Sequence, residues 1–174
     1  AERHGLVMLI LSLATVTAQF AHLGLPNIII RFFPYLKDVK KYIYRLALQI
    51  PIMSMVLLVI CTFLFGDYIL EGYSNKNELF NPHQILLLPL VASLVFFEVL
   101  LSISRSELKT VFPAVLREFV LRLFTLLLLA AYFINWIDFD QFILYWIVLY
   151  GLNVLLLCLY IVRFFLQIEE IYLN

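Results

Sequence analysis

Five long apolar stretches limit what this chain can fold into more than any other feature of the sequence. They cover residues 5–30, 46–66, 83–104, 113–136 and 141–162. Each is long enough for a helix to cross the hydrocarbon core of a bilayer, which takes about 20 residues. Runs such as 56–60 and 63–65 are apolar on every side of a helix and leave no water-facing stripe. We therefore predict an all-α, polytopic membrane helical bundle of about five transmembrane helices, organised as a single bundle over residues 1–174.

The composition excludes several other classes of protein. Hydrophobic residues make up 64% of the chain and charged residues 14%, against roughly 45 to 50% and about 25% in soluble domains. Twelve basic and twelve acidic residues cancel, so no basic field indicates nucleic acid. No nucleophilic triad, phosphate loop or metal motif is present, so we expect no enzyme, no cofactor and no metal. Asp138 and Asp140 have the spacing of a sugar-nucleotide DxD pair, but acids at a helix start are better explained as a cap.

The distribution of Lys and Arg predicts the orientation in the membrane. Ten of the twelve fall on one side of the predicted spans: in the connector after residue 30, in the connector after residue 104 and the start of the helix that follows it, and in the segment after residue 162. The other two, Arg3 and Lys76, fall on the opposite side. We therefore expect the N-terminus of the chain outside and its C-terminus in the cytoplasm. Five spans that start outside suggest that at least one preceding helix belongs to the same protein.

Glu98 is the one acid well inside an apolar stretch. Burying an ionisable group in a membrane costs several kcal/mol unless a partner compensates its charge. One interpretation makes Glu98 a proton or cation site. The favoured interpretation is an ion pair with Arg117 or Arg122 on the neighbouring helix. Other polar residues in or near the stretches are expected to form hydrogen bonds between helices; they are Gln19, His22, Gln49 and Asn153.

Several short motifs resemble those of one family of membrane proteins. They are His4-Gly5-Leu6, Leu23-Gly24-Leu25-Pro26-Asn27, Arg31-Phe32-Phe33-Pro34 and a later run with Arg105, Lys109, Pro113, Leu116-Arg117-Glu118 and Arg122. These stretches resemble spans two to six of polysaccharide biosynthesis proteins, the oligosaccharide flippases of the multidrug/oligosaccharidyl-lipid/polysaccharide superfamily. Members have two six-helix bundles around a central cavity, so the resemblance implies that this chain is part of a larger two-bundle transporter.

The resemblance also implies a function. Such a flippase moves an undecaprenyl-pyrophosphate-linked oligosaccharide, a precursor of polysaccharide or lipopolysaccharide, across the bacterial inner membrane by alternating access. The implied partners are that lipid-linked substrate, membrane lipids, and the missing helices or second bundle of the transporter. Two alternatives are a non-transporting membrane scaffold or assembly subunit, and a cation-coupled multidrug exporter of the same superfamily.

Four arginines are the candidates for binding the anionic pyrophosphate headgroup. Guanidinium groups bind phosphate oxygens through two parallel, charge-assisted hydrogen bonds. The candidates are Arg31, Arg105, Arg117 and Arg122. Arg122 lies deepest along its helix, and Glu118 can pair with it at i, i+4 spacing. The alternative is that these side chains reach back to the cytoplasmic headgroups and act as anchors.

Overall fold

The computed structural model describes residues 2–32, 40–74 and 86–173, and the regular secondary structure in these ranges is helical throughout. This confirms the all-α prediction. The elements are α1 (Glu2–Ala21), α2 (Leu25–Phe32), α3 (Lys40–Ser74), α4 (Leu87–Ser106), α5 (Val111–Val115), a π-helical turn η4 (Leu116–Val120), α6 (Leu121–Phe133) and α7 (Phe139–Leu173).

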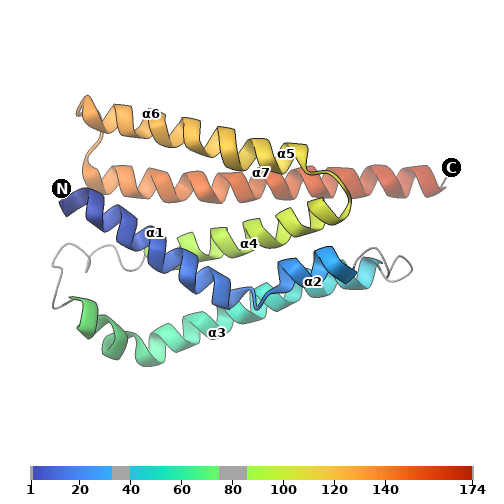
Figure 1. Ribbon diagram of the computed structural model, residues 1–174, viewed down its shortest axis with the longest axis horizontal. Helices are drawn as coiled ribbons and strands as arrows, with labels where there is room; N and C mark the ends of the chain where they lie inside the picture. Colours follow the sequence, from blue (N-terminus) through green and yellow to red (C-terminus); the bar gives the residue numbers. More distant parts are fainter. Residues whose placement is uncertain (1, 33–39, 75–85, 174) are drawn as a thin grey trace.

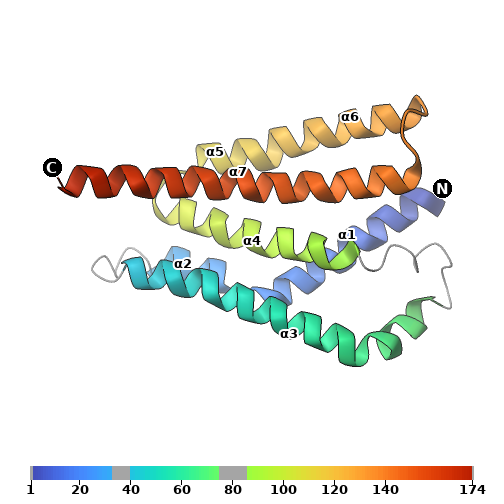
Figure 2. The same ribbon diagram turned by 180° about the vertical axis from the view of Figure 1, so that it is seen from behind.

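The helices lie side by side along the long axis of the molecule (Figure 1). The pair α1–α2, α4 and α7 run in one direction, and α3 and the run α5–η4–α6 return in the other. Helix α4 is central and packs against α1, α2, α3 and α7, whereas α6 packs on α7 at one edge of the bundle. The reverse view shows α3 at the opposite edge (Figure 2). The described helices therefore traverse the bundle five times in alternating directions.

The first apolar stretch differs from the single helix expected over residues 5–30. It is divided into α1 and α2, whose axes are bent by 51° at a short break. Leu23 has φ 50° and Gly24 has φ 72°, and this left-handed backbone ends α1. Glycine adopts such a conformation at little cost, while leucine does so under strain. The break follows the 20 residues of α1 and precedes the 8 residues of α2, so it lies past the middle of this bent helix pair.

The described helices include three that are long and apolar enough to cross a membrane. Their apolar segments are Arg45–Thr62 in α3, Leu87–Ser106 in α4 and Phe139–Arg163 in α7, and the bent pair α1–α2 makes a fourth if it counts as one span. The expected span at 113–136 is not among them, because η4 interrupts it and three charged residues lie in its first half. Residues 83–85, at the start of the third expected span, lie outside the described residues.

Two clusters of buried apolar side chains hold the bundle together. The first joins α1, α4 and α7, and its members on α1 are Ile10, Ala14, Ala18 and Ala21. These alanines allow the backbones of α1 and α4 to approach closely, as small residues do between membrane helices. The second cluster joins α2, α3, α4, η4 and α7. Every residue of α6 is described, and none of them is buried.

Candidate functional site

An ion pair connects α4 to the π-helical turn η4. Arg117 Nη1 lies 3.0 Å from Glu98 Oε1. The side chain of Glu98 is 32% exposed and that of Arg117 is 47% exposed, so the pair lies at the surface of the bundle and not in its core. The favoured interpretation of Glu98 as one half of an interhelical ion pair is confirmed, and of its two expected partners the structure selects Arg117.

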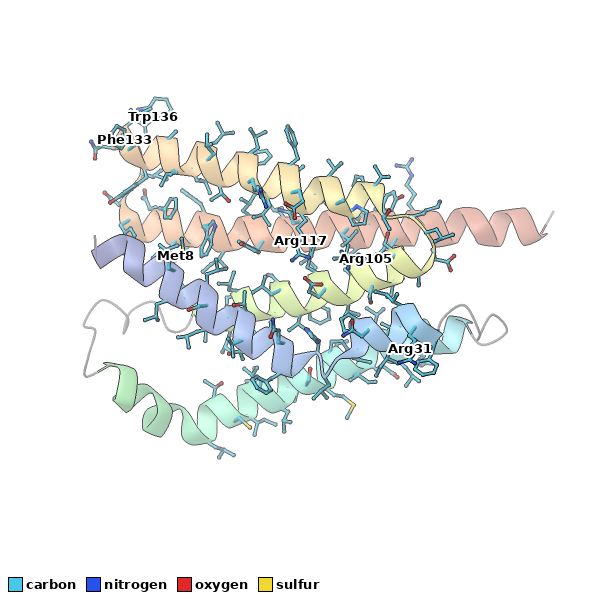
Figure 3. The ribbon with its side chains drawn as sticks, viewed as in Figure 1. Met8, Arg31, Arg105, Arg117, Phe133 and Trp136 are labelled. Carbon is cyan, nitrogen blue, oxygen red and sulfur yellow. The ribbon has the colours of Figure 1, made fainter. Side chains whose placement is uncertain are left out.

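Arg117 is the second residue of the π-helical turn η4, directly after Leu116. A π-helical turn holds one more residue than an α-helical turn and shifts the side chains that follow it around the helix axis. Leu116 is buried. The packed side of the helix continues with three half-buried residues, Leu121, Thr125 and Leu128. Arg117 therefore lies beside the line of packing residues, and it projects over the middle of the bundle toward α4 (Figure 3).

A second ion pair lies along the same helical run. Arg122 Nη2 is 2.6 Å from Glu118 Oε2, at the expected i, i+4 spacing. Their side chains are 75% and 58% exposed, because both project from the side of η4 and α6 that no other described helix covers. The predicted pairing of Arg122 with Glu118 is confirmed. Each of these two arginines is thus bound to a carboxylate.

The other two candidate arginines lie at one end of the bundle. Arg31 is in the last turn of α2 and Arg105 in the last turn of α4, and both are exposed (Figure 3). The Arg31 guanidinium lies 6.0 Å from the centre of the Phe32 ring. Within the described part of the chain neither of them forms an ion pair. Of the four candidates, Arg117 and Arg122 are thus paired with carboxylates, whereas Arg31 and Arg105 are not paired with any described carboxylate.

Two polar residues that were expected to bond between helices bond locally instead. Asn153 on α7 is 1% exposed, and its Nδ2 donates to Leu149 O at 2.9 Å in the same helix. Its Oδ1 has no hydrogen-bond partner among the described residues. His22 Nδ1 accepts a hydrogen bond from the backbone N–H of Gly24 at 3.3 Å, at the break after α1. The prediction of interhelical bonds is wrong for these two residues, because each finds a partner within four positions.

The two aspartates of the DxD pattern lie at the start of α7. Asp138 directly precedes the helix, its backbone N–H donates to Gln141 Oε1 at 3.2 Å, and its carbonyl accepts from Phe142 N at 2.9 Å. Asp140 lies in the first turn, where a negative charge favours the helix dipole. This is the pattern of a helix start. No group of three or more potential metal ligands occurs among residues 2–32, 40–74 and 86–173.

Comparison of the chain with protein-family models, with curated proteins and with solved structures gives no match. The likeness to oligosaccharide flippases therefore rests on the short sequence motifs, and the arrangement of the site has to be interpreted from its own chemistry.

Proposed function

We propose that this chain is a helical unit of a membrane transporter that moves a lipid-linked oligosaccharide across the cytoplasmic membrane of a bacterium. The observation that carries the proposal is the pair of arginines at one end of the bundle. Arg31 and Arg105 are exposed and form no ion pair among the described residues. The excess of Lys and Arg assigns this end to the cytoplasm, where such a substrate is made.

The chemistry of these two side chains suits a pyrophosphate headgroup. A guanidinium group without an acidic partner can offer its full fork of donors to phosphate oxygens. Arg117 and Arg122 are less suited, because each already donates to a carboxylate. Of the four candidates we therefore propose Arg31 and Arg105 as the residues that first bind the headgroup.

The bent first span supports transport over a purely structural role. Discontinuous transmembrane helices recur in transporters, where a break allows part of a span to move. Here the break at Leu23 and Gly24 separates α2, which carries Arg31, from α1. A movement of α2 about this break would displace Arg31 relative to the rest of the bundle.

Binding of a labelled substrate tests the proposal. The chain in nanodiscs should bind a fluorescent undecaprenyl-pyrophosphate disaccharide. The Arg31→Ala/Arg105→Ala variant should bind it about tenfold more weakly, because each lost charge-assisted contact is worth about 1.5 to 3 kcal/mol before solvent screening. Arg163→Ala is the matched control, since it removes an exposed arginine of α7 and should leave the affinity unchanged. Equal affinities for all three proteins would refute the assignment.

Translocation requires more than this chain in the proposed mechanism. Alternating access needs a second unit that moves against the first. Proteoliposomes with the 174-residue chain should therefore show no flipping of the lipid-linked sugar above protein-free vesicles. Flipping by the chain alone would contradict the proposal that it is one unit of a larger transporter, and absence of any substrate binding would favour the scaffold alternative.

A cation-coupled exporter is the second candidate function, and Glu98 is the residue that bears on it. A carboxylate inside a span can bind a cation or a proton. Here Arg117 already compensates its charge at 3.0 Å, which leaves little attraction for another cation. We therefore place this candidate second.

A further inference from the structure

The turn between α6 and α7 exposes large apolar side chains at the end of the bundle opposite Arg31 and Arg105 (Figure 3). Phe133 is 87% exposed, Trp136 is 80% exposed and Ile134 is 59% exposed. We call these three residues the turn surface. A single exposed apolar side chain needs no explanation, but a group of them indicates contact with something other than water.

Hydrogen bonds in the backbone hold the turn surface in place. The N–H of Trp136 donates to Ala131 O at 3.0 Å, and the N–H of Asn135 donates to Tyr132 O at 3.1 Å. Asn135 has φ 60°, a left-handed conformation that asparagine tolerates better than most residues. This is the Schellman motif of a helix end, in which an apolar residue at the position of Trp136 usually packs back on the helix. Here the indole ring stays exposed instead.

Helix α7 relates the turn surface to the membrane. Its segment Phe139–Arg163 is long and apolar enough to cross a bilayer, and it begins three residues after Trp136. The 25 residues of this segment extend over about 37 Å, somewhat more than the hydrocarbon core of about 30 Å. A helix that crosses with this segment leaves the hydrocarbon close to Phe139. The turn surface then lies at the boundary between acyl chains and headgroups.

The composition of the turn suits this boundary. Tryptophan is enriched there because its ring is apolar while its N–H needs a hydrogen-bond partner. The exposed polar residues Asn135, Asp138 and Asp140 lie within the turn and at the start of α7, where they can stay in water. The two aspartates carry the only charges within residues 123–162. No basic side chain at this end therefore attracts anionic headgroups.

We infer that the turn surface is an interfacial anchor that binds neutral or zwitterionic phospholipid. Its apolar side chains insert among the upper parts of the acyl chains, and the indole N–H of Trp136 donates to a lipid ester or headgroup oxygen. Anchors of this kind set the tilt and rotation of the spans that they flank, so this surface holds its end of α7 at a constant depth. Neither the transported substrate nor the orientation of the protein enters this assignment.

Tryptophan fluorescence provides the test, since the chain has two tryptophans. Trp136 is exposed, whereas Trp146 is 4% exposed and belongs to the core. The chain is reconstituted in phosphatidylcholine vesicles, and the emission of the Trp136→Phe variant is subtracted to isolate that of Trp136. Lipids brominated near the headgroup should quench this emission about twofold more than lipids brominated near the ends of the acyl chains. Iodide in the water should quench it much less than it quenches a free tryptophan derivative.

A tryptophan in the middle of the same span is the matched control. Leu152 is 51% exposed and lies near the centre of the segment Phe139–Arg163. In the Trp136→Phe background, Leu152→Trp should show the opposite order, with stronger quenching by bromines near the ends of the acyl chains. If position 152 were quenched in the same order as Trp136, α7 would not cross the bilayer and the anchor would lose its basis.

The quenching of Trp136 itself can overturn the inference in three ways. Free access of iodide without quenching by either brominated lipid would place the turn in water. Stronger quenching by the deep bromines would place it inside the hydrocarbon. Protection from iodide and from both lipids would show that protein, such as a second copy of the chain, covers the turn surface.

Discussion

The two ion pairs differ in what they connect, and this sets the free energy that each contributes. Glu98 and Arg117 join two helices, whereas Glu118 and Arg122 are one turn apart in a single helical run. An i, i+4 ion pair on an exposed helix surface stabilises the helix by about 0.3 to 0.5 kcal/mol. A pair between helices also fixes their relative position, and its lesser exposure reduces screening by solvent.

We predict that a double-mutant cycle separates the two pairs. Replacing Glu98 and Arg117 by Ala, singly and together, should give a coupling free energy of about 1 kcal/mol, because each single variant leaves an uncompensated charge. The same cycle at Glu118 and Arg122 is the control and should give no more than half of that. Reversible unfolding in mixed micelles measures both. Equal coupling in the two cycles would contradict an interhelical role for Arg117.

At the scale of elements, the break between α1 and α2 has a conformational cause that can be tested. Gly24 has φ 72°, and a Cβ placed on it would meet no atom within 4 Å. We predict that Gly24→Ala lowers the free energy of unfolding by about 1 kcal/mol, through backbone strain and not through a clash. Gly5→Ala is the control. Gly5 also has open space around it but lies inside α1, so its replacement by Ala should raise the free energy of unfolding by about 0.5 to 1 kcal/mol. Stabilisation by both changes would mean that the break does not require a left-handed backbone.

The π-helical turn makes a second prediction at this scale. Phe112 stacks on Tyr160 at 4.3 Å between ring centres before the turn, and Tyr132 packs 5.8 Å from Phe142 after it. Because η4 contains one extra residue, deleting the exposed Phe119 should convert it to an α-helical turn and keep both contacts in register. Deleting Leu127, which is similarly exposed, should rotate Tyr132 away from α7 by about 100°. Thermal unfolding should show near-normal stability for the first deletion and a large loss for the second. Equal losses would refute this account of η4.

For the whole molecule, the alternating direction of the helices predicts which connectors share a side of the membrane. The start of α3 and the turn between α4 and α5 lie at one end, and the turn between α6 and α7 lies at the other (Figure 1). From the charge distribution we predict that the first end faces the cytoplasm. In a background without the exposed cysteines 61 and 158, single cysteines at Lys40 and Lys109 should resist an impermeant maleimide in intact cells.

A cysteine at Gln141 should react in the same experiment. So should a cysteine at Lys76, which lies outside the described residues. Labelling at both Lys40 and Lys76 would contradict five crossings. Labelling at Lys40 and Lys109 but not at Gln141 would keep the arrangement of the helices and reverse the orientation of the protein in the membrane.

The sequence by itself determined the class of fold and two local features of the site. Apolar runs of about 20 residues leave helices as the stable form in a bilayer, and this information is local in sequence. The pairing of Arg122 with Glu118 is equally local, since i, i+4 spacing alone makes the side chains neighbours. The position of Asp138 before α7 also follows from its place after the apolar stretch.

Only the tertiary structure decided how the helices bend and which distant residues meet. The left-handed backbone at Leu23 is stabilised by packing of α1 and α2 against α4 and has no signal in the side chain of leucine. The choice of Arg117 over Arg122 as the partner of Glu98 depends on η4, whose extra residue shifts the following side chains by a fraction of a turn. Such rotations come from the balance of contacts across the whole bundle, because a helix of uniformly apolar residues carries no period that would fix its rotation.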